Sequence, residues 1–173
     1  MKYLLLTALL LLLLGVWAAA ARQKLAALDR NVDHAMCQLT LLLTSRADAV
    51  LSLLALAEKY GAQAAGPLAE RLRGRCRELT ARSLPEEVLA QENLLSAACR
   101  DAMLLAGQRP DMQSDPDYAQ YTGVMDSCAR MLRTGHLIYN DSAARLNSAL
   151  RRFPTRLIAG LLGFHRRGLL DAA

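Results

Sequence analysis

The feature that most constrains the fold is an uncharged stretch of nineteen residues at the start of the chain, from Tyr3 to Ala21. At about 1.5 Å of rise per residue, a helix of this length reaches ~28 Å, close to the thickness of the hydrocarbon core of a bilayer. The residues expected to form the anchor in lipid are Tyr3, Leu4, Leu5, Leu6, Leu12, Leu13 and Trp17. The sequence therefore predicts a transmembrane anchor over residues 1–22, followed by a helical domain over residues 23–173.

The same stretch also has features of a cleavable secretory signal. Lys2 supplies a positive start, and the alanines at 18–21 offer cleavage sites. The apolar run is long for a signal, however, and Arg22 and Lys24 follow it directly, as in a stop-transfer segment. An anchor is the favoured interpretation, and a secreted or periplasmic soluble binding module released by cleavage is the alternative. Because Arg22, Lys24 and Arg30 outnumber the positive groups before the run, a single-pass protein of the cell membrane with its domain in the cytoplasm is favoured.

The composition beyond the anchor is that of a helical bundle. About 150 residues remain, enough for one domain with its own core. The chain has only two Phe and one Trp, and Trp17 lies in the anchor, so the core must be built from Leu, Ala, Met and Val. The net charge of +5 is better explained by an anionic membrane surface than by nucleic acid, because the arginines are interspersed with acids. We therefore expect the lipid bilayer as a partner and no nucleic acid.

The cysteines and histidines are spaced without a metal or redox motif. The cysteines are Cys37, Cys76, Cys99 and Cys128, and the histidines are His34, His136 and His165. We expect the cysteines to be small buried residues on helices rather than disulfides, and the histidines to lie at the surface or at helix caps. Nothing supplies a nucleophile with an adjacent base in a pocket, so we expect no catalytic residue, cofactor, metal or small-molecule substrate.

A long helix is predicted directly after the anchor. From Leu25, apolar residues recur at alternating spacings of three and four over five heptads, broken once by Arg46. This spacing predicts a helix of ~38 residues that supercoils with a partner and ends at Gly66-Pro67. Arg46 either extends along apolar surface to place its guanidinium in solvent, which is favoured, or pairs with a carboxylate on a facing helix. Asp48 is expected to face elsewhere and to be solvated.

Three further helices complete the predicted domain. Two shorter ones are expected over residues 67–82 and 85–107, followed by a loop over residues 108–115. Asp115 should cap a fourth helix, in which ten uncharged steps of three or four residues run from Tyr118 to Phe153. The sequence therefore predicts an all-α fold: an N-terminal transmembrane helix, then an elongated antiparallel four-helix bundle whose first and last helices pair.

Two groups of residues resemble a known family. The first comprises Tyr139, Asn140, Asp141, Asn147, Phe153, Pro154, Gly163 and Phe164. The second runs from Val32 to Ala35 and continues with Arg46, Ala47, Asp48 and Leu53. Together they resemble the LemA family of small membrane-anchored bacterial proteins. The resemblance covers nearly the whole chain and implies a long four-helix bundle, an N-terminal membrane span and no established enzymatic activity.

The end of the chain, residues 154–170, combines an apolar set with arginines. The residues expected at an interface are Arg156, Leu157, Leu161, Arg166 and Arg167. In an up-down-up-down bundle the fourth helix returns the chain to the membrane, so this segment is predicted to form a short amphipathic helix at the bilayer surface. The alternative is that its leucines cap the open end of the bundle.

The residues support an interaction protein rather than an enzyme. Asn140 and Asp141 are expected to hydrogen-bond locally on the flank of a packed helix, because no convergent acid or base accompanies them. The two long helices offer more apolar surface than two short helices can cover, which favours self-association. We expect a membrane-tethered helical scaffold or adaptor that presents helical surfaces to other membrane proteins or to a second copy.

Overall fold

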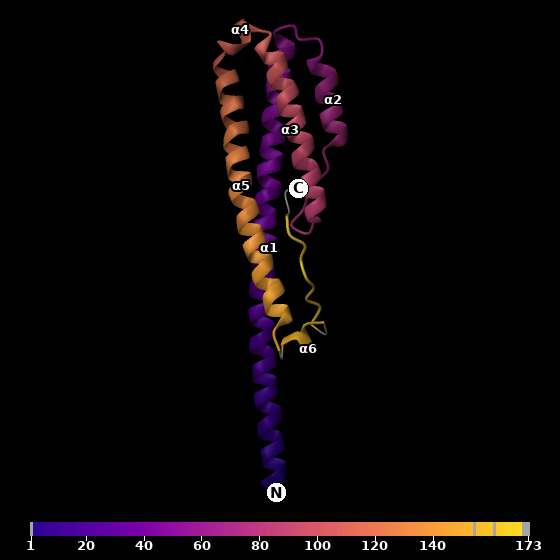
Figure 1. Ribbon diagram of the computed structural model, residues 1–173, viewed down its shortest axis with the longest axis vertical. Helices are drawn as coiled ribbons and strands as arrows, with labels where there is room; N and C mark the ends of the chain where they lie inside the picture. Colours follow the sequence, from indigo (N-terminus) through magenta and orange to yellow (C-terminus); the bar gives the residue numbers. More distant parts are fainter. Residues whose placement is uncertain (1, 154, 161, 171–173) are drawn as a thin grey trace.

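A single helix of 58 residues, α1 (Lys2–Lys59), is the central element of the protein (Figure 1). The computed structural model describes residues 2–153, 155–160 and 162–170, and this part of the chain contains helices and no strand. The apolar N-terminal run and the first helix of the domain are continuous, so no break separates the expected anchor from the domain at residue 22. The first part of α1 projects alone, and the other helices pack around the rest.

The remaining helices alternate in direction along α1 (Figure 1). They are α2 (Ala65–Arg75), α3 (Pro85–Gly107), α4 (Pro110–Gln113), α5 (Pro116–Arg151) and α6 (Thr155–Ala159). α5 runs antiparallel to α1 and packs along it, as predicted, whereas α2 has only 11 residues and covers α1 and α3 near one end. The prediction of an all-helical protein is confirmed. The finer prediction of a four-helix antiparallel bundle is not confirmed, since the four helices do not cover one another over a common length.

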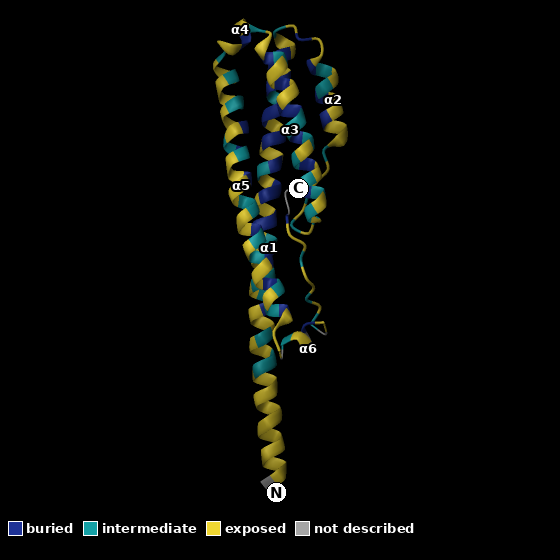
Figure 2. Ribbon diagram, in the orientation of Figure 1, coloured by how far each residue is buried: buried dark blue, intermediate teal, exposed yellow. Residues whose placement is uncertain are grey.

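The predicted seam between α1 and α5 is buried (Figure 2). Its core residues include Val32, Leu39 and Leu53 of α1, and Cys128, Leu132, Tyr139 and Leu146 of α5. The two helices approach closely at Gly135, where an added Cβ atom would lie 2.6 Å from Cδ2 of Leu39. Phe153 departs from this seam and is 81% exposed, because the backbone becomes extended at Arg152 and the helical spacing ends there.

The end of α1 differs from the prediction. The helix ends at Lys59 rather than at Gly66-Pro67, because Gly61 adopts a φ of 82°, a conformation that glycine takes without a steric penalty. The Arg109 guanidinium donates hydrogen bonds of 2.8 Å to the carbonyls of Tyr60 and Gly61. A charged side chain therefore satisfies two carbonyls that the terminated helix leaves free.

The second helix is also shorter than predicted and begins earlier. Pro67 lies in the first turn of α2, as predicted, where its missing N–H needs no helical partner, but two residues precede it in the helix. The helix ends at Arg75, and residues 76–84 connect it to α3 without helical structure.

The starts of the two later helices are as predicted. α3 begins at Pro85, and the Glu87 carboxylate accepts a hydrogen bond from the Leu84 N–H over 2.9 Å. Asp115 caps α5 by accepting a hydrogen bond of 2.9 Å from the Asp117 N–H. The predicted loop before α5 contains the single turn of α4.

Candidate functional site

The last described residues form an extended tail instead of the predicted amphipathic helix. Among the described residues after α5, only those of α6 are helical, and a turn follows in which Gly163 has a φ of 77°. The chain then runs back along α5 toward the start of α3 (Figure 1). We call residues 165–170 the tail. Only Leu170 among them is buried, so the hydrophobic effect contributes little to holding this segment.

Two asparagines of α5 hold the main chain of the tail. The Asn147 side chain donates to the Arg167 carbonyl over 2.8 Å and accepts from the Arg167 N–H over 3.0 Å. The Asn140 side chain makes the same pair of bonds to Leu170, at 2.9 and 2.8 Å. Each amide thus satisfies both polar groups of one tail residue, as a neighbouring strand would do in a sheet. The local hydrogen bonding expected for Asn140 is wrong, because its partner is 30 residues away.

Tyr139 adds a third main-chain contact and forms part of the core below the tail. The residue is 2% exposed, and its hydroxyl donates a hydrogen bond of 3.0 Å to the Gly168 carbonyl. Burial raises the pKa of the Tyr139 phenol, so the group stays protonated and available as a donor. Tyrosine is suited to this position because its ring packs in the core while its hydroxyl reaches a polar partner.

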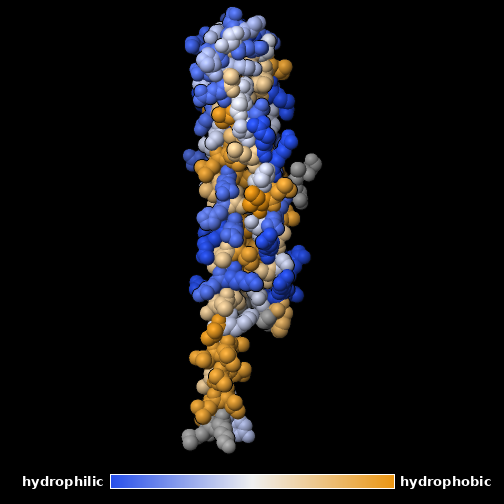
Figure 3. Space-filling model, turned by 90° about the vertical axis from the view of Figure 1, so that its left-hand side faces the viewer, coloured by the Kyte–Doolittle hydropathy of each residue, from blue (hydrophilic) through white to orange (hydrophobic). Residues whose placement is uncertain are grey.

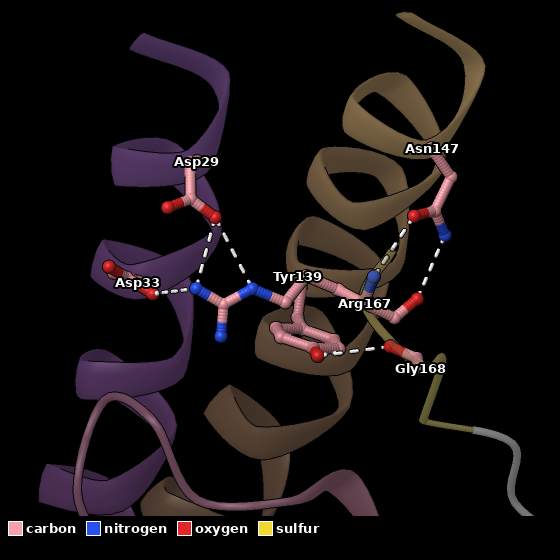
Figure 4. A network of polar contacts seen from close by, with 6 residues as sticks. All are labelled: Asp29, Asp33, Tyr139, Asn147, Arg167 and Gly168. Atoms are coloured by element: carbon pink, nitrogen blue, oxygen red, sulfur yellow. Dashed lines mark hydrogen bonds and ion pairs between the residues drawn. The ribbon is translucent and has the colours of Figure 1, made fainter. Parts of the chain in front are cut away.

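Arg167 connects the tail to the first helix (Figure 4). Its guanidinium lies 3.0 Å from the Asp29 carboxylate and 2.9 Å from the Asp33 carboxylate, with all three side chains partly shielded from solvent. Burial alone would lower the pKa of Arg167, but the hydrogen bond to Asp29 and the charges of both carboxylates raise it. We call Asp29, Asp33, Tyr139, Asn140 and Asn147 the clasp.

The clasp alters the interpretation of the interfacial candidates. Arg167 was expected to meet lipid, yet its charge is directed at two carboxylates of α1. Arg156 and Arg166 are exposed, as an interfacial role requires. The backbone of Leu157 lies in α6, whereas Pro154 and Leu161 lie outside the described residues. Phe164 is half-buried against the core.

Arg46 lies in the core rather than in solvent, contrary to the favoured prediction. It is 9% exposed, and its guanidinium donates a hydrogen bond of 3.3 Å to the Ser96 hydroxyl of α3. Asp48 is exposed, as expected. Asp141 is exposed too and pairs with Arg145 one turn later, at 2.9 Å. These three residues of the family motif therefore lie outside the clasp.

A second polar contact between helices joins α3 to α5. His136 lies 3.0 Å from the Glu92 carboxylate, and its side chain is largely shielded between the helices rather than at the surface or a helix cap as expected. Sequence spacing could not reveal the pair because the two residues are on different helices. The pKa of Glu92 is lowered by its contact with His136 and by the charges of His136 and Arg46, although burial opposes the shift.

The cysteines follow the prediction in part. Cys99 and Cys128 are buried, Cys76 is partly buried, and Cys37 is exposed on α1. All four are free thiols. In the described residues, no group of three or more His, Cys, Asp or Glu side chains is placed to hold a metal ion.

The chemistry of the clasp is that of recognition. It presents two amides, a phenol and two carboxylates to a single extended segment, and it binds that segment through hydrogen bonds and ion pairs. Asp29 was missed by the sequence reasoning. A signal was present, because Asp29 and Asp33 are four residues apart on one helix, a spacing that places both acids on one face.

Fold and site together define an all-helical protein with a long apolar N-terminal helix and a tail held between its two longest helices. A family model matches residues 35–173, and its description is the LemA family. The chain therefore belongs to the LemA family, as its motifs indicate. Tyr139, Asn140, Asn147 and the tail lie inside the matched region, and Asp29 and Asp33 precede it. No curated protein matches the chain.

Proposed function

We propose that this protein is a membrane-tethered helical scaffold or adaptor, a bundle held at the cell membrane by a single span that presents helical surfaces to partner proteins or to a second copy. The observation that carries the proposal is the apolar start of α1. An 18-residue window of this helix is long and apolar enough to cross a bilayer, and none of it is buried (Figure 3). Exposed leucines over this length are costly in water and favourable in lipid.

The end of the bundle nearest the apolar run also has features that favour a position beside the membrane. A cavity of about 310 Å³ there is lined by Ala21, Lys24, Arg145 and Arg152, among others. Phe153 is exposed at this end, directly after α5. Cations and an exposed aromatic ring beside the end of a span are typical of the zone of lipid headgroups.

A partner surface is supported by apolar residues on the outside of α5. Val124, Met131 and Ile138 are 38%, 56% and 48% exposed, and their seven-residue spacing places them on one face of the helix. A seven-residue apolar repeat on an exposed face is typical of helices that pack against another helix. This is the surface that we propose for an adaptor or for self-association.

The proposal is tested by extraction of the full-length chain from membranes with alkaline carbonate. We expect the chain to stay in the membrane with a mass that includes residues 1–21, and with the domain on the cytoplasmic side by protease protection. A matched control is the double variant Leu11→Arg/Leu12→Arg, which should be extracted because arginine is costly at the centre of a span. A mature N-terminus near Ala21 would instead support the alternative, a secreted or periplasmic binding module released by cleavage.

A further inference from the structure

The clasp binds its tail as a receptor binds an extended peptide. The hydrogen bonds of Asn147 and Asn140 to the tail are made to main-chain atoms of Arg167 and Leu170. Their spacing matches the ligand, because seven helical residues rise ~10.5 Å and three extended residues span ~10 Å. The two amides can therefore hold any extended segment that lies in this register.

Three residues of the tail restrict which segment fits. Arg167 is paired with the two aspartates, and Leu170 is 3% exposed. At Gly168 an added Cβ atom would lie 3.3 Å from Cγ of Pro85, so a larger residue would press against the start of α3. The clasp therefore fits the sequence Arg-Gly-x-Leu in an extended conformation.

Three features allow the tail to dissociate from the clasp: its exposure to solvent, a cavity beside it and glycines in the turn before it. Apart from Leu170, the described residues from 162 to 170 are partly or fully exposed. A cavity of about 400 Å³ lies beside the tail, lined by Asp29, Pro85, Tyr139, Gly163 and Gly168 among others. The turn that precedes the tail contains Gly160 and Gly163, whose backbones rotate with little steric hindrance.

We propose that the clasp also binds the tail of a second copy of this chain, so that neighbouring copies exchange their tails. An identical segment restores every hydrogen bond and ion pair, which makes such an exchange inexpensive. The eight residues from 160 to 167 can extend ~28 Å, more than the ~20 Å width of two adjacent helices. The inference rests on the proposed tethering, because copies anchored in one membrane hold clasps and tails at the same height and at a high effective concentration.

The test uses two full-length variants reconstituted in the same liposomes. The receiver carries Arg167→Ala, which loosens its own tail and leaves its clasp intact. The donor carries Asp29→Asn/Asp33→Asn, which weakens its clasp, and a photo-crosslinking amino acid in place of the exposed His165. Light should produce a donor–receiver heterodimer. Its yield should be roughly tenfold higher than with a donor that also carries Arg167→Ala, since losing a hydrogen bond between charged groups weakens binding by about that factor.

A synthetic peptide of residues 162–170 should suppress the heterodimer by occupying the clasp. Equal yields from the two donors, or crosslinks only within one chain, would overturn the exchange while both chains still resist carbonate extraction. Extraction of the chains by carbonate would overturn the tethering, and with it the basis of the exchange.

Hydrogen–deuterium exchange of the wild-type chain supplies a test that does not depend on the variants folding. The amides of Arg167 and Leu170 should exchange faster than that of the core residue Leu132, because the tail leaves the clasp without unfolding of the bundle. If the tail amides exchange only at the rate of global unfolding, the tail is part of the core and the proposal fails.

Discussion

Replacing Gly135 by alanine tests the close contact on which the α1–α5 seam depends. An added Cβ atom would lie 2.6 Å from Cδ2 and 3.4 Å from Cγ of Leu39. Carbon atoms in contact are normally about 3.5–4.0 Å apart, so one group must move by ~1 Å. Leu39 is fully buried, and the close packing of protein interiors leaves little space into which its side chain can move.

Two opposing effects set the size of the change. Overpacking a filled core costs about 1–3 kcal/mol, whereas alanine in place of glycine in a helix gains about 0.5–1 kcal/mol. Gly123→Ala, in the same helix, isolates the second effect, because nothing lies within 4 Å of the added atom. We therefore expect Gly123→Ala to stabilise the protein, and Gly135→Ala to be less stable than Gly123→Ala by about 1–3 kcal/mol.

The measurement is denaturant unfolding of the full-length chain in mild detergent, followed by far-ultraviolet circular dichroism. Adding Leu39→Ala to Gly135→Ala should recover part of the steric cost, and the double-mutant cycle gives the coupling between the two positions. If Gly135→Ala is as stable as Gly123→Ala, the helices do not approach as closely as the structure shows, and the argument for the seam is refuted.

Three further outcomes follow from the described contacts. The pKa of Glu92 is lowered in the folded protein, so the ionised carboxylate stabilises the fold above the ordinary pKa of 4.5, and this stabilisation is lost as pH falls through the lower folded value. The difference in unfolding free energy between wild type and Glu92→Gln should therefore disappear in acid. A difference that stays constant when unfolding is measured across pH would contradict this. Asn147→Asp keeps an acceptor for the Arg167 N–H but removes the donor to the Arg167 carbonyl. Hydrogen–deuterium exchange of the tail amides should therefore accelerate, while the amides of the helices keep their exchange rates. Unchanged exchange in the tail would contradict the contact. Cys37 should be the first cysteine to react with a maleimide, as measured by mass spectrometry. The other three thiols are wholly or partly buried, and burial raises the pKa of each. Equally fast labelling of all four cysteines would show that the fold is wrong.

Local chemistry explains why much of the helical layout follows from the sequence. The apolar run from Tyr3 to Ala21 predicts a helix whose apolar surface is exposed to its surroundings. The spacing of three and four residues after Leu25 predicts a helix whose apolar face is paired with another helix. Pro85 and Pro116 begin helices because a proline at a first turn loses no hydrogen bond. The seam of α5 follows at Met125, Cys128, Leu132, Tyr139 and Leu146, whereas Ala143 and Leu150 are buried in place of the predicted Ser142 and Ala149.

The sequence alone could not decide between two possible ends of the first helix. Both Gly61 and Gly66-Pro67 could end the first helix, and the carbonyls of Tyr60 and Gly61 that the earlier end leaves free are bound by Arg109, 48 or more residues away. Arg46 shows the same limit. Its side chain can reach solvent or remain buried, and the Ser96 hydroxyl on α3 gives it a buried partner.

The clasp is what the tertiary structure alone determined. A local pattern of arginines and leucines in residues 154–170 fits an interfacial helix, because helical periodicity describes only neighbours along the chain. The partners of Arg167 are 138 and 134 residues away, and those of the tail backbone lie on α5. Once α1 and α5 are packed antiparallel, two carboxylates and two amides face the same space, and an extended main chain satisfies them better than a helix, whose N–H and C=O groups are already bonded to each other.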